Sequence, residues 1–184
     1  MTVMKTIQTK IEGCWLIKPK VIEDSRGYFY ESFQKERFEQ ATQSSFNPIQ
    51  DNEAYSTYGV IRGLHFQEPP FEQAKLIRAL KGTILDVAVD LRKDSKTYGA
   101  VVTAELSQEN KDQLFIPKGC AHGYAVLSYD AIVFYKTDAY YYPEKEGGVL
   151  YNDPEFNIDW RIPEKNQILS DKDTLWKGFK KEIL

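Results

Sequence analysis

From residue 48 onward, short strand-like runs alternate with turns about every ten residues, and this pattern limits the possible folds more than any other feature. Residues 83–91 alternate with the two-residue period of a strand, one face carrying Leu85, Val87, Val89 and Leu91. Residues 98–106, 121–128 and 131–137 alternate in the same way. Many short antiparallel strands at this spacing predict a β-sandwich or barrel, with a jelly roll as its closed form.

The first quarter of the chain is less regular. Residues 11–22 are predicted as a strand that Pro19 interrupts, and residues 28–33 as a short aromatic strand after a turn. Residues 34–42 are charged, with Phe38 and Ala41 about one turn apart, which predicts a single short helix. Beyond Pro154 the patterning is weak, and we expect one or two short helices on the outside of the sheets.

Size and composition indicate one globular domain over residues 1–184. A chain of this length buries about 70% of the surface that it exposes when unfolded. The net charge of −3 argues against a nucleic-acid-binding surface. No window approaches the roughly eighteen apolar residues of a membrane span, and Met1–Lys20 lacks the apolar stretch of a secretion signal. The 2 cysteines form no disulfide framework. We therefore expect a cytoplasmic protein without membrane or nucleic-acid partners.

Several polar residues interrupt the apolar faces of the predicted strands. A solvent-exposed strand face explains Glu105 and Lys136, and Asp86 and Asp90 fit either such a face or a barrel interior. Five other polar residues are spread over several strands between apolar neighbours, and a solvent-exposed face explains them less well. They are His65, Gln67, Lys75, His122 and Tyr135. Together these residues predict a polar cavity.

The 2 histidines bear on whether that cavity holds a metal. Metal-dependent jelly-roll enzymes cluster two or three histidines with a carboxylate, because first-row metals need imidazoles that converge on one point. Here His65 and His122 lie in different predicted strands and form no His-x-His pair. A two-histidine, one-carboxylate site stays open, but the pattern favours metal-free acid–base chemistry without a cofactor and with histidine as the base.

Several motifs, in order along almost the whole chain, resemble the dTDP-4-dehydrorhamnose 3,5-epimerase family. They are the strings at residues 24–31, 50–52, 62–67, 116–124, 135–136 and 152–154, together with Lys75. The resemblance implies a mainly-β, cupin-like jelly roll (a double-stranded β-helix) with a few short peripheral helices, which works without metal as a homodimer. The implied substrate is dTDP-4-dehydro-6-deoxy-D-glucose, which is inverted at C3 and C5 to give dTDP-4-dehydro-L-rhamnose.

The resemblance also implies residue roles. His65 is the base, Asp173 its partner, Tyr135 the acid on the opposite face of the sugar, and Lys75 stabilises negative charge at the ketone oxygen. Arg62 suits the diphosphate, because its guanidinium donates to phosphate oxygens. The full set of implied substrate-binding residues is Arg26, Phe29, Glu31, Gln50, Asp51, Asn52, Arg62, His122, Tyr140, Glu146 and Lys172.

By chemistry alone, some of these residues also fit another role, and other residues could take their place. Ser170 and Asp173 equally suit the first turn of a helix. Three further tyrosines follow Tyr135 within seven residues, at positions 140–142. The sequence also departs from the family pattern at Cys120, at Asp138-Ala139 and at residues 160–163. We expect Cys120 to leave a roomier wall near His122.

Other functions are compatible with parts of the sequence. A relative acting on the same keto sugar could invert C3 alone or move the ketone, although the string at residues 62–65 argues against a ketoisomerase. Two further alternatives belong to other functional classes. One is a metal-dependent cupin oxygenase, and the other is a non-catalytic sugar-binding jelly roll. In a homodimer, the aromatic strand at residues 28–33 is a candidate for exchange between subunits, which would cover an open sheet edge.

Overall fold

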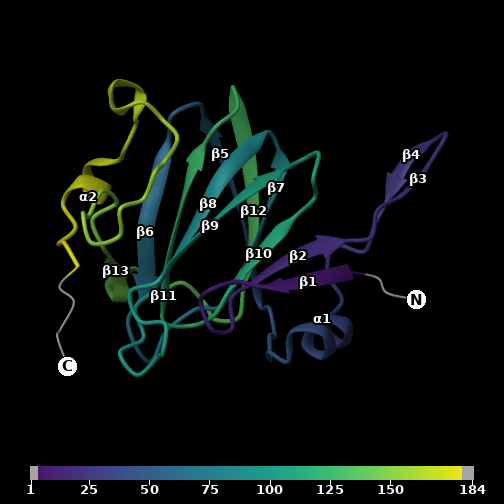
Figure 1. Ribbon diagram of the computed structural model, residues 1–184, viewed down its shortest axis with the longest axis horizontal. Helices are drawn as coiled ribbons and strands as arrows, with labels where there is room; N and C mark the ends of the chain where they lie inside the picture. The colour runs from purple at the N-terminus through teal and green to yellow at the C-terminus, as the bar shows by residue number, and fades with distance from the viewer. Residues whose placement is uncertain (1–3, 180–184) are drawn as a thin grey trace.

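Two antiparallel sheets face each other in the computed structural model, which describes residues 4–179 (Figure 1). Over these residues the 6-stranded sheet contains, in spatial order, β1 (Met4–Gln8), β2 (Trp15–Pro19), β10 (Gln113–Ile116), β7 (Lys75–Lys81), β12 (Asp130–Thr137) and β5 (Gln50–Thr57). The 5-stranded sheet contains β13 (Glu146–Gly148), β6 (Ile61–Gln67), β11 (Cys120–Val126), β8 (Thr83–Asp90) and β9 (Val101–Ser107). The predicted mainly-β jelly roll is confirmed.

The space between the two sheets holds the main hydrophobic core. Its members come from both sheets and include Ile77, Ile84, Ala88, Leu106, Leu114, Val126, Ala131 and Val133. Strand β8 contributes only one of its two faces to this core. Its other face, with Leu85, Val87 and Val89, packs beneath the chain that follows β13. Because both faces of β8 are covered, Asp86 and Asp90 point into the interior, and their exposed-face interpretation is wrong.

The C-terminal part of the chain lies over the outer face of the 5-stranded sheet, where Phe156, Trp160 and Ile162 pack on it. This region contains the short helices η2 (Glu164–Asn166) and α2 (Asp171–Thr174), as expected. Helix η1 (Pro143–Lys145) precedes β13. No helix within residues 4–179 is long and apolar enough to cross a membrane.

Helix α1 (Lys35–Thr42) covers the outer face of the 6-stranded sheet and confirms the predicted helix. The Gln34 side chain caps its first turn by accepting the N–H of Arg37 at 2.6 Å. Phe38 is the buried anchor of the helix, and its ring packs on Phe115 of β10 with centroids 4.9 Å apart. The apolar side of this short helix is therefore matched to the sheet on which it lies.

The predicted aromatic strand at residues 28–33 is only partly formed. Strands β3 (Ile22–Asp24) and β4 (Gly27–Phe29) pair as a hairpin that stands away from the two sheets (Figure 1). After Phe29 the chain leaves the strand, because its next aromatic residues have partners on the main body. The Tyr30 hydroxyl accepts a hydrogen bond from Arg78 at 2.6 Å. The Phe33 ring packs against the rings of Phe38 and Phe46.

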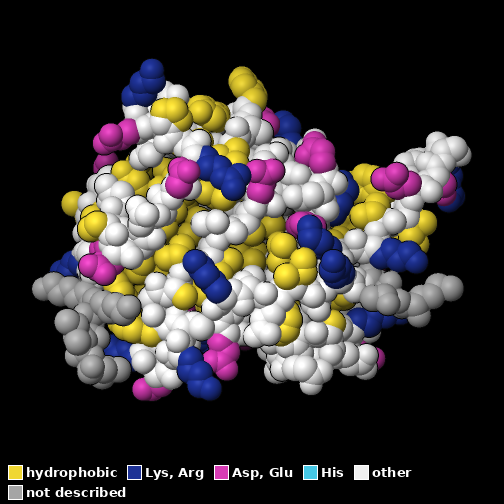
Figure 2. Space-filling view, in the orientation of Figure 1, with side chains coloured by type: hydrophobic (Ala, Val, Ile, Leu, Met, Phe, Trp, Pro, Cys, Tyr) yellow, Lys and Arg dark blue, Asp and Glu magenta, His cyan; other side chains and the backbone are white. Residues whose placement is uncertain are grey.

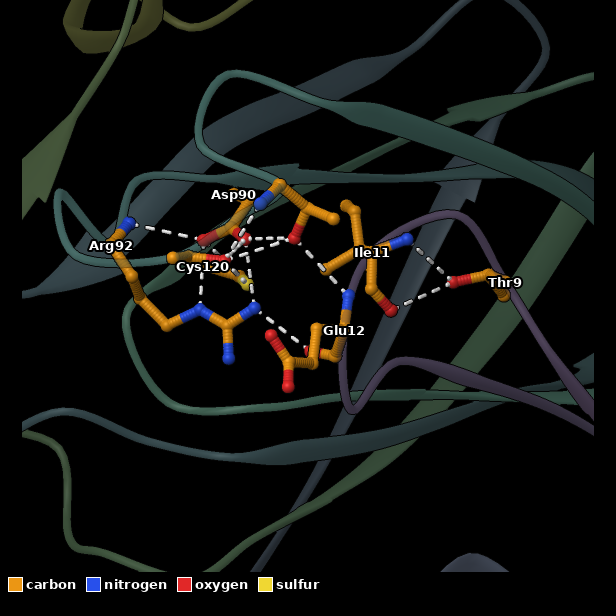
Figure 3. Close-up of polar contacts among 8 residues, drawn as sticks. Thr9, Ile11, Glu12, Asp90, Arg92 and Cys120 are labelled. Carbon is orange, nitrogen blue, oxygen red and sulfur yellow. Dashed lines mark hydrogen bonds and ion pairs between the residues drawn. The ribbon is translucent and has the colours of Figure 1, made fainter.

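A buried carboxylate ties the end of β8 to the loop between β1 and β2 (Figure 3). Asp90 accepts hydrogen bonds from the Arg92 guanidinium at 2.8 Å, from Ser95 at 2.7 Å and from Thr97 at 2.6 Å. Arg92 also donates to the carbonyl of Glu12 at 2.8 Å. Burial would raise the pKa of Asp90, but the hydrogen bonds from Arg92, Thr97 and Ser95 outweigh it and lower that pKa to about 2.

Asp90→Asn is expected to lower the free energy of unfolding by about 2 kcal/mol at pH 7, because the folded state holds the ionised carboxylate better than the unfolded chain does. A depressed folded-state pKa stabilises the protein above the unfolded pKa of about 4. The difference between variant and wild type should therefore shrink as the pH falls from about 4 towards 2.

Urea unfolding at several pH values measures both effects. Asp94→Asn, at an exposed carboxylate in the same loop, is the matched control and should unfold like the wild type. Equal stability of Asp90→Asn and the wild type at pH 7 would contradict the assignment.

Candidate active site

A cavity of about 390 Å³ lies between the two sheets. The 6-stranded sheet contributes side chains from β5, β7 and β12, and the 5-stranded sheet contributes from β6, β11 and β13. The lining residues are Gln50, Asn52, Ala54, Arg62, His65, Phe66, Gln67, Gln73, Lys75, His122, Tyr124, Tyr135, Tyr141, Glu146 and Lys172. The polar cavity predicted from His65, Gln67, Lys75, His122 and Tyr135 is therefore present, with all five in its wall.

Arg62 and His65 both line the cavity although they are three residues apart, a spacing that places residues on opposite faces of a regular strand. The pairing of β6 with β11 is irregular here, since His65 pairs with His122 but Arg62 pairs with Tyr124. Strand β6 thus carries one extra residue, as in a β-bulge. A Cβ atom at Gly63 would lie 2.5 Å from the Cα of Gly123, and Gly63 has a φ of +128°, so glycine is required at this bulge.

His65 Nε2 lies 2.5 Å from Asp173 Oδ1 on α2. The Ser170 hydroxyl also accepts the backbone N–H of Asp173 at 3.2 Å, so the helix-capping interpretation and the histidine-partner interpretation hold together. Burial would raise the pKa of Asp173, but the hydrogen bonds with His65 and Ser170 and the nearby charge of Lys172 together outweigh it and hold that pKa below its usual value. With Nε2 occupied by the carboxylate, Nδ1 is the ring nitrogen left for a ligand.

A second histidine–aspartate pair lies beside the first, with His122 Nε2 2.7 Å from Asp86 Oδ1. Burial lowers the pKa of His122, which keeps its imidazole neutral at pH 7. The other oxygen of Asp86 has no hydrogen-bond partner within residues 4–179. Burial also lowers the pKa of Lys75 to about 8, against the opposing pull of Asp86 and Glu146. Lys75 therefore places a positive charge in the cavity at pH 7, and this charge is lost at a lower pH than that of an ordinary lysine.

Tyr135 on β12 lines the cavity from the sheet opposite His65. Burial, followed by the neighbouring Tyr124, raises the pKa of Tyr135, so its phenol is protonated at pH 7 and can donate a proton or hydrogen bond. Arg62 Nε donates to the Ser56 hydroxyl at 3.1 Å, which orients the guanidinium on the same wall as Tyr124.

Glu146 joins two segments that line the cavity. It accepts hydrogen bonds from the Tyr141 hydroxyl at 2.8 Å and from Lys172 Nζ at 2.8 Å. Burial would raise the pKa of Glu146, but the hydrogen bonds from Lys172 and Tyr141 outweigh it and lower that pKa. The hydrogen bond to Glu146 raises the pKa of Tyr141 to about 12, so this phenol stays protonated and remains a donor. The chain that carries Asp173 is thereby held to β13.

Five of the residues implied as substrate-binding do not reach this cavity. Asp51 is exposed and pairs with Lys136 at 3.0 Å, because β5 alternates and turns Gln50 and Asn52 inward instead. The Tyr140 side chain is 58% exposed, and only its carbonyl is used, as an acceptor from Gln67. Arg26, Phe29 and Glu31 lie on or next to the projecting hairpin, away from the cavity of their own chain.

Some cavity residues were missed at the sequence level. Tyr124 shares the inward face of β11 with His122, and Ala54 shares that of β5 with Asn52, so alternation could have identified both. Tyr141, Phe66 and Gln73 carry no such signal, because their strand or loop geometry decides where they point.

Cys120 does not line the cavity, so the expectation of a roomier wall at this residue is wrong. Its sulfur lies 4.0 Å from Asp90, at the polar cluster of Figure 3.

Within the described residues, no three side chains of the kinds His, Cys, Asp and Glu are arranged to hold a metal ion. Each of the two histidines is instead hydrogen-bonded to an aspartate. The arrangement can perform proton transfer, with an imidazole on one wall and a protonated phenol on the facing wall.

The chain matches known proteins over nearly its full length. Residues 8–181 match the family described as dTDP-4-dehydrorhamnose 3,5-epimerase. The dTDP-4-dehydrorhamnose 3,5-epimerase of Shigella flexneri is 48% identical over 96% of both chains. The crystal structure of this enzyme from Elizabethkingia anophelis superposes with a TM-score of 0.93 at 47% identity, covering 96% of this chain and 97% of that one.

A second solved structure contains a ligand. It is dTDP-6-deoxy-D-glucose-3,5-epimerase from Legionella pneumophila in complex with dTDP-4-keto-L-rhamnose. It superposes with a TM-score of 0.90 at 46% identity, covering 95% of this chain and 92% of that one.

Lys75 is expected to titrate near pH 8 rather than near the ordinary lysine value of 10.5, because burial disfavours its charge. Asp86→Asn should lower the pKa of Lys75 further by removing a carboxylate that favours the ammonium form. NMR of the lysines after reductive ¹³C-dimethylation measures this pKa, with Lys75→Arg to assign the signal. Glu105→Gln, at an exposed carboxylate, is the control. Titration near pH 10.5 would contradict the prediction.

Proposed function

The chain belongs to the dTDP-4-dehydrorhamnose 3,5-epimerase family, and on that premise we propose that it inverts C3 and C5 of dTDP-4-dehydro-6-deoxy-D-glucose. The product is dTDP-4-dehydro-L-rhamnose, in the route to dTDP-L-rhamnose. The observation that carries the proposal is that His65 and Tyr135 line one cavity from opposite sheets. Inversion of a carbon requires a base on one face and an acid on the other.

The substrate's chemistry explains why these two groups suffice. C3 and C5 both flank the C4 ketone, so loss of either proton gives an enolate whose charge rests on the ketone oxygen. His65 Nδ1 takes the proton and becomes an imidazolium, which the carboxylate of Asp173 stabilises through Nε2. Tyr135 returns a proton to the opposite face of the same carbon. Before the next inversion Tyr135 regains a proton from water, and the imidazolium of His65 releases its proton to water.

Lys75 supplies the positive charge that the enolate needs. Its side chain lines the cavity from β7, and a preorganised donor at a developing oxyanion is worth about 10²–10³ in rate in other enzymes. The neutral His122, fixed by Asp86, is a second donor or acceptor for the sugar. His122 therefore acts in substrate binding rather than as a second base.

The remaining cavity residues suit the nucleotide and the sugar hydroxyls. Arg62 presents its guanidinium to the diphosphate, as planar forks suit phosphate oxygens. Gln50 and Asn52 are hydrogen-bonded to each other at 2.9 Å and turn polar groups toward the cavity. Glu146 and Lys172 complete this set.

The enzyme is proposed to work as a homodimer in which the β3–β4 hairpin of one subunit reaches the cavity of the other. Ile22, Tyr28 and Phe29 on this hairpin are exposed, and large exposed apolar side chains mark contact surfaces. Figure 2 shows the hairpin projecting from the right of the molecule, with hydrophobic side chains near its base. Arg26, Phe29 and Glu31 would then contact substrate in the partner's site.

The cytoplasm is the proposed compartment. Cys14 and Cys120 are free, buried thiols, which suits a reducing environment.

Incubation with dTDP-4-dehydro-6-deoxy-D-glucose in D₂O, followed by NMR and mass spectrometry, tests the proposal. The wild type should incorporate deuterium at C3 and C5 and give the L-configured product. His65→Ala should lose about 10²–10⁴-fold in rate at both carbons. Tyr135→Phe should still exchange protons but not invert, since His65 can return a proton only to the face from which it took one. Tyr129→Phe, at a residue that is 88% exposed, is the control.

Each other outcome of this incubation points elsewhere. Inversion at C3 alone would indicate a mono-epimerase, and a displaced ketone an isomerase. Tight binding without exchange would indicate a sugar-binding protein. Stoichiometric metal bound through both histidines would favour an oxygenase. Normal turnover by His65→Ala or Tyr135→Phe would overturn the assigned roles.

Mixed dimers test the exchanged hairpin. Arg26→Ala and His65→Ala should each have low epimerase activity when expressed alone. The loss in Arg26→Ala should be seen at low substrate concentration. When the two are co-expressed, about a quarter of all sites should combine His65 from one subunit with Arg26 from the other. Recovery of about a quarter of wild-type activity is expected. No recovery, or a monomer by light scattering at micromolar concentration, would contradict the proposal.

A further inference from the structure

Trp176 lies three residues beyond Asp173, on the chain that leaves α2. It is not among the residues that line the cavity. Its ring meets the His65 imidazole edge to face, with centroids 6.3 Å apart and an interplanar angle of 67°. Trp176 therefore contacts the base without lining the cavity itself.

The indole rests on Gly148 of β13, the residue paired directly with His65 across the two strands. A Cβ atom at Gly148 would overlap the six-membered and five-membered rings of the indole and would lie 2.5 Å from Nε1. Gly148 does not have a positive φ, so an alanine there is compatible with the backbone. The missing side chain at this position thus makes room for Trp176.

The segment that carries Asp173 and Trp176 is fixed on both sides. Upstream, the carbonyl of Ile168 accepts the N–H of Ile61 at 2.9 Å. Downstream, the carbonyl of Lys177 accepts the N–H of Leu150 at 3.1 Å, and Phe179 N–H donates to Asp153 at 2.5 Å. Asp173 and Trp176 are therefore set as a unit against β6 and β13.

The indole N–H of Trp176 is buried and has no hydrogen-bond partner within residues 4–179. No hydrogen bond from this nitrogen therefore positions the ring, which is set by packing against Gly148 and His65. A buried N–H without a partner destabilises the folded state. A phenylalanine would fill most of the same space without that cost.

From this geometry we propose that Trp176 is a positioning residue for proton abstraction. Its ring backs the imidazole of His65, keeps water from the Nε2–Oδ1 bond to Asp173, and so holds Nδ1 toward the cavity. The inference rests on the proposed function, in which His65 is the base. It adds a residue that acts through His65 and does not touch the substrate.

The test compares five variants in the D₂O incubation. Trp176→Ala should lower kcat by about 10–100-fold with little change in KM, because a displaced base loses reactive geometry while the binding wall stays intact. Trp176→Phe should retain most of the rate. Leu175→Ala, at the neighbouring residue that is 79% exposed, is the matched control and should behave as wild type.

Gly148→Ala and the double variant make the test specific to the indole. Gly148→Ala alone should push the ring off β13 and reproduce the loss of kcat seen in Trp176→Ala. In the Trp176→Ala background the same substitution should have little further effect, because nothing remains for the methyl group to displace. Equal harm in both backgrounds would overturn the contact argument.

A spectroscopic readout separates positioning from general stability. Nitrogen-15 NMR of the two histidines should show His65 as a single tautomer protonated at Nε2 in the wild type, with His65→Asn to assign it. Trp176→Ala should give a mixture of tautomers while circular dichroism shows an intact fold. Should Trp176→Ala unfold, Gly148→Ala keeps the test informative, because it displaces the same ring at a backbone position that accepts alanine.

The outcomes distinguish this inference from the function on which it rests. A wild type that exchanges no deuterium refutes the proposed function itself. A wild type that epimerises normally, alongside Trp176→Ala and Gly148→Ala with unchanged kcat and an unchanged His65 tautomer, refutes the positioning role alone.

Discussion

The hydrogen bond between His65 Nε2 and Asp173 Oδ1 is the interaction on which the proposed chemistry depends. It joins an inner strand of the 5-stranded sheet to a short helix near the end of the chain, so it forms only when the C-terminal segment packs on that sheet. The apolar contacts of Phe156, Trp160 and Ile162 with β8 and its neighbours hold that segment in place. Hydrophobic burial on the outside of the sheet thus orients the proposed catalytic base on the inside.

The interior of the jelly roll is divided between an apolar core and a polar cavity. Buried polar groups are costly unless they are paired, and here both histidines and Asp90 have close partners. Within residues 4–179 the buried side-chain atoms without a hydrogen-bond partner are one oxygen of Asp86, the Tyr124 hydroxyl and the indole N–H groups of Trp15 and Trp176. Of these residues Tyr124 lines the cavity, where a polar ligand can supply the partner that its hydroxyl lacks.

Much of the fold could be predicted because β-alternation is a local property. The strands near residues 83–91, 98–106, 121–128 and 131–137 and the helix at residues 34–42 all appear close to their expected positions. The faces were harder to predict. Asp86 and Asp90 lie on a strand covered on both sides, and nothing in their own neighbourhood reveals the covering chain. The aromatic strand after Gly27 ends early because Tyr30 and Phe33 find partners far away in the sequence.

By itself, the sequence determined the β architecture, the presence of a polar cavity and, through its motifs, the family and the residues to inspect. Only the tertiary structure decided which of them converge. It turned Asp51 outward by strand parity, brought Arg62 and His65 to one wall through a bulge at Gly63, and left Arg26 and Phe29 on a hairpin outside their own cavity. It also set Trp176 behind His65. These outcomes depend on register and on long-range packing, which arise between segments distant in the chain and leave no local trace in either one.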